Sequence, residues 1–339
     1  MSPLIKMALY ILIVVCLIII GLVILALFPT RIKSLPVSNP AQSYDDALRR
    51  IQDIQSRERD NPHINPACYT RLLTHDQETE RAIVLLHGFT SCPEQFAQLG
   101  EAFYQKGYNV YIPRMPGHGY YQRSGEALKN RTPEEMLTFA SESADIGRGL
   151  GAGLTVSGLS GGGSLTVWLA QERGDIDLAA PISPFLGIGF IPSALNRPLA
   201  NLANRLPDFF QWWDPVHKAN NPLTASYAYT RYPVHALDNF LIIGFSTKHS
   251  AKRTAPAAGQ IIMVTNASDR SVNNDINQRM VSIWQGQSEA KVHHYQFPKD
   301  LDLPHDLITP TRKGSRIDLV YPKLVELLGA AKKSTGAVQ

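Results

Sequence analysis

Gly158-Leu159-Ser160-Gly161-Gly162, near the middle of the 339-residue chain, is the stretch that decides the fold. It follows an apolar, β-prone segment that contains Leu154 and Val156, and it precedes a helix-like run over residues 164–173. Gly-x-Ser-x-Gly between a strand and a helix is typical of a nucleophile elbow, a sharp turn that holds the serine hydroxyl at the top of a sheet. Glycines flank the serine because side chains there would collide with the neighbouring strand and helix. The motif predicts Ser160 as a nucleophile.

Short motifs on either side of this stretch accompany an alternation of strands and helices. An apolar run over residues 81–87 is typical of a buried strand, and residues 108–112 and 260–264 are typical of two more. Such alternation predicts a mostly parallel sheet that is covered by helices on both faces. The loops beside these strands carry His87-Gly88-Phe89-Thr90-Ser91, Pro116-Gly117-His118-Gly119, Ala267-Ser268-Asp269-Arg270-Ser271-Val272 and, later, His305.

With these motifs in this order, residues 81–328 resemble the α/β-hydrolase superfamily. Within it, the chain is most similar to bacterial carboxylesterases and monoacylglycerol-lipase-like serine hydrolases. The resemblance implies an α/β-hydrolase fold with a helical cap insertion and a catalytic triad in the chain order Ser, Asp or Glu, His. It also implies an oxyanion hole made by two backbone N–H groups, those of Phe89 and Gly161.

Asp269 is the candidate acid of this triad. It lies in the loop after the apolar run 260–264, which places its carboxylate at the carboxyl edge of the sheet, on the same side as Ser160. A helix N-cap is the alternative role for an aspartate at this position. Asp275 is a second candidate, but it is expected to lie inside the following helix.

His305 is the candidate base, because it lies in a loop after the last expected strand, residues 290–297. From a loop, the imidazole can reach Ser160 and be oriented by Asp269. His293 and His294 are adjacent on that strand, so one faces inward and one outward, as is typical of packing and surface residues.

The composition excludes several other kinds of site. The three cysteines cannot form a Cys-rich zinc site, and no His-x-x-x-His spacing indicates another metal, so we expect neither a metal nor a cofactor. The formal charge of +4 is small for this length, and the basic residues are scattered, which argues against nucleic-acid binding. No protein partner is inferred.

The amino terminus contains a second strong signal. Residues 7–28 include no charged residue and are mostly Ile, Leu and Val. At about 1.5 Å per residue this stretch forms a helix of about 33 Å, which is long enough to cross a bilayer core. A cleaved signal peptide has a shorter apolar stretch and a small-residue cleavage site, and Ala26-Leu27-Phe28 is a poor one. We therefore predict a single-pass membrane anchor.

The orientation of the anchor stays open from charge alone, since Lys6 lies on one side and Arg31 and Lys33 lie on the other. The cysteines add one argument. Cys68 precedes the first central strand and Cys92 follows it, so the two could form a disulfide. A disulfide would favour a hydrolase domain outside the cytoplasm.

The sequence predicts the following organisation. Residues 1–6 flank the anchor at 7–28, and a linker rich in Pro and Ser follows at 29–42. The hydrolase domain covers 43–330 and begins with an amphipathic helix over 43–59, and a polar tail occupies 331–339.

A cap insertion is expected at about 184–237, and most of its apolar side chains are expected to form the cap's own small core. Those named for this region are Phe185, Phe190, Ile191, Leu195, Leu199, Leu206, Phe209, Phe210, Trp212 and Trp213. Phe209, Phe210, Trp212 and Trp213 are the candidates to line an acyl pocket.

The sequence thus predicts a membrane-anchored serine hydrolase that cleaves carboxylic esters through an acyl-enzyme on Ser160. Monoacylglycerols and other lipid esters fit the tether and the apolar cap. One alternative is a serine aminopeptidase or amidase of the same fold, for which Asp208 and Asp214 could hold a substrate amine. The other is a catalytically silent, membrane-tethered binding protein.

Overall fold

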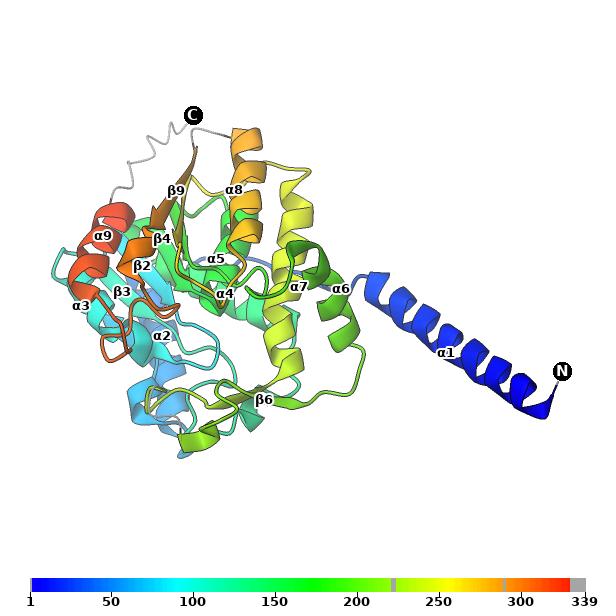
Figure 1. The fold of residues 1–339 in the computed structure, drawn as a ribbon. Coiled ribbons are helices and arrows are strands. Elements are labelled where there is room, and N and C mark those ends of the chain that lie inside the picture. The colour runs from blue at the N-terminus through cyan, green and yellow to red at the C-terminus, as the bar shows by residue number, and fades with distance from the viewer. Residues whose placement is uncertain (1, 221–223, 289–290, 330–339) are drawn as a thin grey trace.

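A central, mostly parallel β-sheet organises the chain (Figure 1), for which the computed structural model describes residues 2–220, 224–288 and 291–329. The predicted polar tail at 331–339 lies outside the described residues. Within them the sheet has the strand order β1-β3-β2-β4-β5-β8-β9, and only β1 runs antiparallel to its neighbour. Its strands are β1 (Arg71–Leu73), β2 (Thr79–Leu86), β3 (Asn109–Ile112), β4 (Gly151–Leu159), β5 (Leu178–Ile182), β8 (Gln260–Asn266) and β9 (Val292–Phe297).

Helices cover both faces of this sheet, as the alternating sequence pattern predicts. The first face carries α2 (Tyr44–Arg59), α4 (Pro133–Arg148), α5 (Gly161–Glu172), α7 (Val234–Ala251) and α8 (Asn274–Ser288). The other face carries α3 (Ala97–Tyr104) and α9 (Ile317–Gly329).

Alternate side chains of β2 point to opposite faces of the sheet and so pack into two separate apolar clusters. Ala82, Val84 and Leu86 pack into the cluster on the first face, whereas Ile83 and Leu85 pack into the cluster on the other. A strand that is buried on both faces needs apolar residues at every position, which is why this segment is a continuous apolar run.

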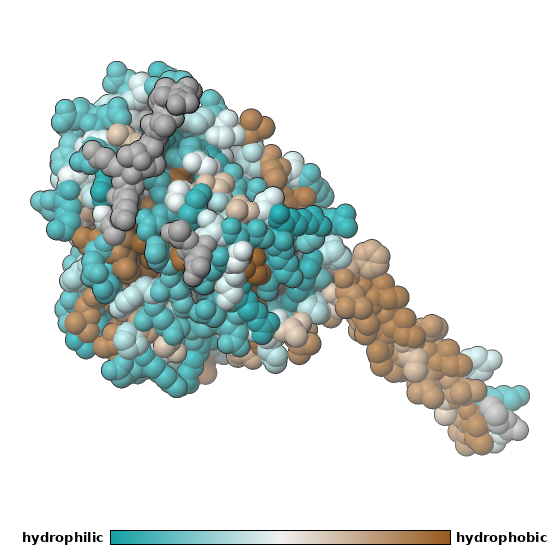
Figure 2. Space-filling view, turned by 90° about the horizontal axis from the view of Figure 1, so that it is seen from above, coloured by the Kyte–Doolittle hydropathy of each residue, from teal (hydrophilic) through white to brown (hydrophobic). Residues whose placement is uncertain are grey.

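The amino-terminal helix α1 (Pro3–Leu27) stands outside these layers (Figure 1). It has a mean hydropathy of 3.4 over its most apolar window, and none of its residues is buried. Figure 2 shows its continuous apolar surface projecting from a mostly hydrophilic domain. By length and composition α1 can cross a membrane, although a signal sequence has the same properties.

The segment after α1, predicted as a linker, lies along the domain. The hydroxyl of Ser38 and the backbone N–H of Asn39 each donate a 2.8 Å hydrogen bond to the carboxylate of Asp145 on α4. Ser43 then caps α2, accepting a hydrogen bond from Asp46 N at 3.2 Å. These contacts hold the end of the segment against α4 and the start of α2.

The insertion between β5 and α7 contains helix α6 (Ser193–Ala203) and a two-stranded ribbon of β6 (Phe210–Trp212) and β7 (Arg231–Pro233). The expectation that most of its apolar residues form a cap core is wrong, because more than half of them are exposed, and the buried positions of α6 are Asn196, Ala200 and Asn201. Six of the ten side chains named above are exposed: Phe190, Leu195, Leu199, Leu206, Phe209 and Trp213.

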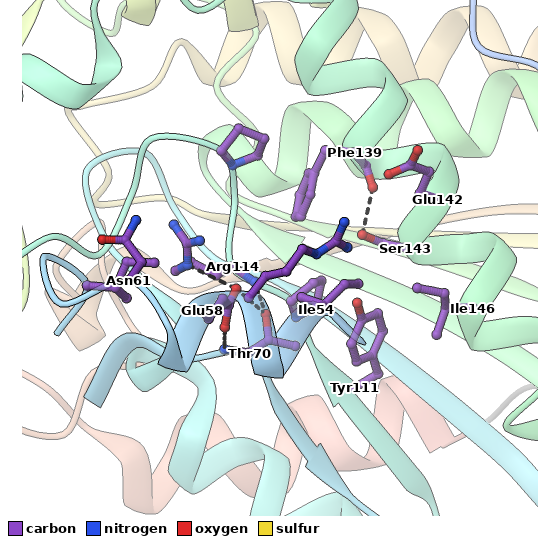
Figure 3. A pocket seen from close by; sticks show the side chains of 14 residues that line it. Ile54, Glu58, Asn61, Thr70, Tyr111, Arg114, Phe139, Glu142, Ser143 and Ile146 are labelled. Atoms are coloured by element: carbon purple, nitrogen blue, oxygen red, sulfur yellow. Dashed lines mark hydrogen bonds and ion pairs between the residues drawn. The ribbon is translucent and has the colours of Figure 1, made fainter. Parts of the chain in front are cut away.

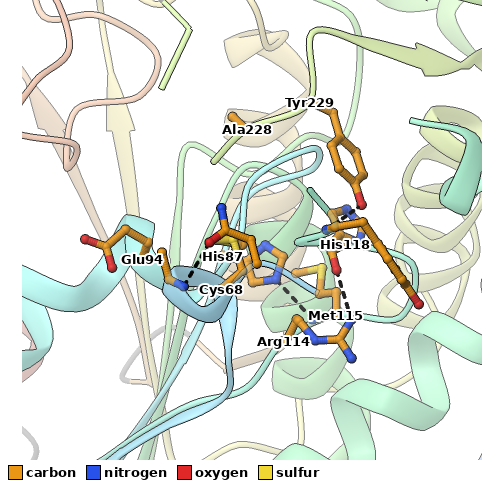
Figure 4. Close-up of a disulfide and its surroundings, with 12 residues drawn as sticks. Cys68, His87, Glu94, Arg114, Met115, His118, Ala228 and Tyr229 are labelled. Carbon is orange, nitrogen blue, oxygen red and sulfur yellow. Dashed lines mark hydrogen bonds between the residues drawn. A yellow bond between two sulfur atoms is a disulfide. The ribbon is translucent and has the colours of Figure 1, made fainter. Parts of the chain in front are cut away.

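Cys68 and Cys92 form a disulfide in the structure, with their Cα atoms 5.3 Å apart (Figure 4). Cys68 ends the short 3₁₀ segment Pro66–Cys68, and Cys92 precedes the 3₁₀ segment Pro93–Phe96. Gly119 packs against this disulfide with a φ of +76°, and a Cβ atom there would lie 2.6 Å from the Cβ of Cys68. The disulfide therefore ties the segment before the sheet to the loop that follows β2.

Candidate active site

Ser160 sits at the turn between β4 and α5 in a backbone conformation that few residues adopt. Its φ is 56° and its ψ is −112°. The surroundings fix this conformation from both sides, because Ser160 N donates to Ile182 O at 3.0 Å and Ser160 O accepts from Phe185 N at 3.1 Å. Strained backbone of this kind persists only where the neighbouring structure over-determines it, and it is concentrated at functional sites.

The two glycines that flank this turn are required by lack of space. A Cβ atom on Gly158 would lie 2.4 Å from Gly162 O, and one on Gly162 would lie 2.0 Å from Leu86 O. Both distances are far inside van der Waals contact with backbone atoms that cannot move independently. The start of α5 can therefore approach β2 and β4 only because these positions have no side chain.

Two backbone amides lie beside the serine. A Cβ atom on Gly161 would lie 3.2 Å from Phe89 N, which shows how closely the loop after β2 approaches the first turn of α5. Within the described residues, neither Phe89 N nor Gly161 N donates a hydrogen bond. Two adjacent free amides are what an oxyanion hole needs.

The loop that carries Phe89 is held from three sides. Gly88 N donates to the side chain of Gln95 at 2.7 Å. Thr90, at a φ of 63°, accepts hydrogen bonds from the indole N–H of Trp213 at 2.9 Å and from the backbone N–H of Tyr229 at 2.8 Å. The insertion therefore fixes the loop that places the Phe89 amide.

The four aromatic residues proposed as an acyl wall are in different environments. Trp213 packs edge-on against Phe89, with ring centroids 6.3 Å apart. Phe210 and Trp212 instead stack on the guanidinium of Arg231, at 4.5 and 5.4 Å. Phe209 is exposed. Of the four, the structure brings Trp213 to the loop beside Ser160.

Asp269 and His305 form a hydrogen-bonded pair. The imidazole Nδ1 lies 2.6 Å from Asp269 Oδ2, and the acid's side chain is completely buried. Since a carboxylate only accepts, Nδ1 donates, which leaves Nε2 as the basic atom. The other carboxylate oxygen accepts from Ser271 N at 2.8 Å and Val272 N at 3.3 Å. These local bonds hold the turn that follows Asp269. Asp275, the second candidate, lies in α8.

The electrostatics of this pair suit a general base. Burial alone would lower the pKa of His305, but the charge of Asp269 and the hydrogen bond to it outweigh burial and raise that pKa above 6.5. Burial would likewise raise the pKa of Asp269, but the interactions with His305 lower it. The Asp269 carboxylate therefore stays ionised at neutral pH, which is the state needed to stabilise a protonated imidazole beside it.

Within the described part of the chain, no hydrogen bond joins Ser160 Oγ to His305. Contacts between catalytic groups are often long in ligand-free enzymes and tighten in the complex with substrate. The structure therefore brings Asp269 and His305 together, and it brings the Phe89 amide to the turn of Ser160.

Asn266, at the end of β8, is a site residue that the sequence analysis missed. It is fully buried, and its Nδ2 donates to Leu303 O at 2.8 Å and to Pro304 O at 3.2 Å, in the loop that carries His305. Its side-chain oxygen accepts from Ser268 N at 3.0 Å, and its carbonyl accepts from Asp269 N at 3.1 Å. One residue thus ties the acid loop to the base loop. A polar residue that ends an otherwise apolar strand was the available signal.

His87 and His118 are buried and pack edge-on, with ring centroids 5.2 Å apart. His87 donates from Nδ1 to Gly88 O at 2.9 Å and accepts from Met115 N at 3.0 Å, which links the two loops near the disulfide (Figure 4). Burial lowers the pKa of His87 well below its usual value and lowers that of His118 to about 4. Of the adjacent pair on β9, His294 bonds Thr265 Oγ1 at 2.8 Å and His293 is exposed.

A cavity of about 270 Å³ lies between α2 and α4, away from this site (Figure 3). Glu58 and Arg114 form an ion pair at 3.0 Å in its wall, and Thr70 donates from both N and Oγ1 to Glu58. None of the proposed catalytic residues lines it. No cluster of His, Cys, Asp and Glu among the described residues could hold a metal ion.

Comparison with known proteins supports the same fold. A family model described as "Alpha/beta hydrolase family" matches residues 83–303, which is more than half of the chain. A thermostable monoacylglycerol lipase of Bacillus sp. (strain H-257) is 34% identical over 120 residues, which are 34% of this chain and 44% of that protein. The match therefore spans less than half of that relative's length.

Solved structures extend the likeness across most of the domain. One of two metagenome-derived lipolytic enzymes superposes with a TM-score of 0.57 at 20% identity, over 78% of this chain and 99% of that chain. The monoacylglycerol lipase of Paleococcus ferrophilus gives 0.55 at 17% identity, over 78% and 99%. A soluble variant of the Saccharomyces cerevisiae monoglyceride lipase gives 0.56 at 12% identity, over 78% and 92%. At these identities the likeness is one of fold.

The substitution Asn266→Ala should lower hydrolytic kcat by about 10- to 100-fold. It removes the bonds that position the loop of His305, and small displacements of catalytic groups have effects of this size. The matched control is Asn109→Ala. Asn109 is also fully buried, and its Nδ2 donates to two backbone carbonyls, Gln77 O and Leu150 O, both at 2.7 Å and far from the site. Both variants should lose stability, but only Asn266→Ala should lose turnover per folded molecule. Equal turnover in the two variants would refute the positioning role.

The pH profile should report the His305–Asp269 pair. Since the base must be neutral to accept a proton, kcat/KM should rise with pH through the pKa of His305, with a midpoint above 6.5. In Asp269→Asn the charge is absent and burial dominates, so the midpoint should move below 6.5 while kcat falls about 10⁴-fold. An unchanged midpoint in the variant would show that Asp269 does not set the pKa of the base.

Proposed function

The chain belongs to the alpha/beta hydrolase family, and from this premise we propose that it is a membrane-anchored serine hydrolase that cleaves carboxylic esters, with monoacylglycerols and related lipid esters as the substrate class. The observation that carries the proposal is the position of Ser160, in a strained turn beside two free amides. That arrangement suits attack on an acyl carbon and the charge that develops on its oxygen.

In the proposed mechanism, His305 Nε2 removes the proton from Ser160 Oγ as the oxygen attacks the ester carbonyl. The N–H groups of Phe89 and Gly161 stabilise the oxyanion of the tetrahedral intermediate, and one such donor is typically worth ~10²–10³ in rate. The imidazolium then gives its proton to the departing alcohol, which leaves an acyl-enzyme on Ser160. Water, deprotonated by the same imidazole, attacks the acyl-enzyme and releases the acid.

The side chains of the insertion favour an ester over a peptide. An aminopeptidase would need a free carboxylate in the cap to hold the substrate amine. Asp214 already accepts hydrogen bonds from Val216 N and from the backbone and side chain of His217. Asp208 accepts from His235 N at 3.0 Å at the start of α7. Both acids thus serve local structure.

Helix α1 and the disulfide support a proposal for the placement of the protein in the cell. We infer that the apolar stretch at 7–28, which forms most of helix α1, crosses the membrane once and leaves the domain attached to it. A disulfide persists in oxidising compartments, so the Cys68–Cys92 bond favours a hydrolase domain on the extracytoplasmic side.

Ser160→Ala should lower turnover of p-nitrophenyl butyrate by roughly 10⁴-fold or more, because the nucleophile is removed. The matched control is Ser157→Ala, on β4 three residues before Ser160, where the fully buried hydroxyl donates to Ala180 O at 2.7 Å. A fluorophosphonate should label the natural chain and Ser157→Ala but not Ser160→Ala. Retained turnover in Ser160→Ala, or no turnover and no labelling in the natural chain, would contradict the proposed enzyme.

A further inference from the structure

Helix α6 of the insertion has its polar and apolar sides reversed relative to an ordinary surface helix. Leu195, Leu199, Leu202 and Leu206 follow one another at spacings of four, three and four residues, so they form one stripe along α6 and the turn after it, which we call the leucine stripe. Surface helices normally turn such a stripe toward the core. Here Leu195, Leu199 and Leu206 are 50%, 44% and 44% exposed.

The buried side of α6 is held instead by asparagines. Asn196 is 1% exposed, and its side chain bonds Ile188 N at 2.6 Å and Ile191 O at 3.0 Å. Asn201 is 4% exposed. The buried side of α6 thus consists of Ala200, which packs in the apolar core, and two hydrogen-bonded asparagines, whereas the leucines lie on the opposite side.

Asn201 links α6 to the end of α1. Its Nδ2 donates to Ala26 O at 3.0 Å, and its Oδ1 accepts from Thr30 N at 3.3 Å. The Arg205 guanidinium also donates to Thr30 Oγ1 at 3.4 Å. Ala26 is in the last turn of α1, where a helix leaves carbonyls without intrahelical partners. One side chain of the insertion therefore binds both sides of the point where the apolar helix ends.

This contact fixes the depth of α6 relative to the anchor. Figure 1 shows α6 lying next to the end of α1 where the chain enters the domain. If α1 crosses a bilayer, its last turn lies where the acyl chains meet the headgroups, and α6, bound to that turn, lies at the same level. A helix with an exposed apolar stripe at that level is the arrangement of an interfacial amphipathic helix.

The charges near α6 match a membrane surface that is negatively charged. Helix α6 carries one charged residue, Arg197, and Arg205 follows it; the nearest acidic residue along the insertion is Asp208, after the leucine stripe. Arg31 and Lys33 follow the anchor directly. Basic residues at this level are attracted to anionic headgroups.

We propose that the leucine stripe of α6 is a membrane-docking surface that inserts into the interface of an anionic bilayer, and that Asn201 couples it to the anchor. This inference rests on the membrane anchorage in the proposed function. It adds that the insertion itself lies on the lipid, so that the domain cannot rotate freely at the end of a tether. The occupant of the stripe is lipid, and a protein partner is an outcome that the test distinguishes.

The test uses the full chain in phosphatidylcholine–phosphatidylglycerol vesicles. Cys16 is the free cysteine of the described chain, so Cys16→Ser leaves no reactive thiol there. Leu199→Cys in that background carries an environment-sensitive fluorophore, NBD. Leu319→Cys is the matched control, because Leu319 is 39% exposed on α9. NBD at position 199 should emit at shorter wavelength and be quenched by nitroxide lipids, whereas NBD at position 319 should do neither.

Three results separate the possible failures. If NBD at position 199 emits at the same wavelength as NBD at position 319, and the protein resists extraction by carbonate, the docking surface is overturned and the anchor stands. A blue shift at 199 without quenching by nitroxide lipid would assign the stripe to a protein contact and also overturn it. Release of the chain by carbonate would overturn the anchor and the docking surface together. Ester turnover is measured separately, so its absence would contradict the proposed enzyme without changing the fluorescence result.

A functional readout accompanies the fluorescence. The double variant Leu195→Ser with Leu199→Ser should hydrolyse soluble p-nitrophenyl butyrate at the natural rate, since neither residue contacts the proposed machinery. Hydrolysis of a monoacylglycerol held in the vesicles should fall about tenfold, because the apolar contact that keeps the cap at the interface is lost. Equal loss on both substrates, or on neither, would contradict a docking role.

Discussion

The close approach of β2, β4 and α5 at Ser160 is the constraint on which the rest of the site depends. Backbone atoms of Leu86, Gly158 and Gly162 meet so closely that a methyl group at either glycine would overlap a carbonyl oxygen. That packing forces the serine into its strained turn and brings the loop after β2 against the first turn of α5. The amides of Phe89 and Gly161 become neighbours as a result. Geometry of this kind is set by folding, so no reorganisation is needed at the moment of reaction.

The proposed acid and base follow separate strands, so their positions need a connection of their own. Asp269 follows β8 and His305 follows β9, and Asn266 binds the backbone of both loops. The insertion does the same for the loop that carries Phe89 through Trp213 and Tyr229, which both donate to Thr90. The proposed chemistry therefore rests on supporting hydrogen bonds in the sheet's loops and in the cap.

Much of the fold was predictable because its signals are local. The apolar runs of the central strands, Ser43 as the cap of α2 and the glycines around Ser160 each follow from a short stretch of sequence. What could not be predicted depends on contacts between distant segments. Asn266 binds the backbone of a loop 37 residues away. Ser38 and Asn39 bind Asp145, so the Pro-rich segment lies on the domain instead of forming a free linker. Asn201 donates to Ala26 O, which is 175 residues away in the sequence. The leucine spacing of α6 indicates one apolar face of a helix, but it does not indicate that this face is exposed to solvent instead of packed on the domain.

The central claim is that the serine and its two amides are assembled before substrate binds. The most direct test is a crystal structure of the chain inhibited by a fluorophosphonate. We expect phosphorus bonded to Ser160 Oγ, a phosphonyl oxygen about 3 Å from both Phe89 N and Gly161 N, and the backbone of both loops unmoved. A phosphonate on another residue, or an oxygen that points away from both amides, would contradict the account.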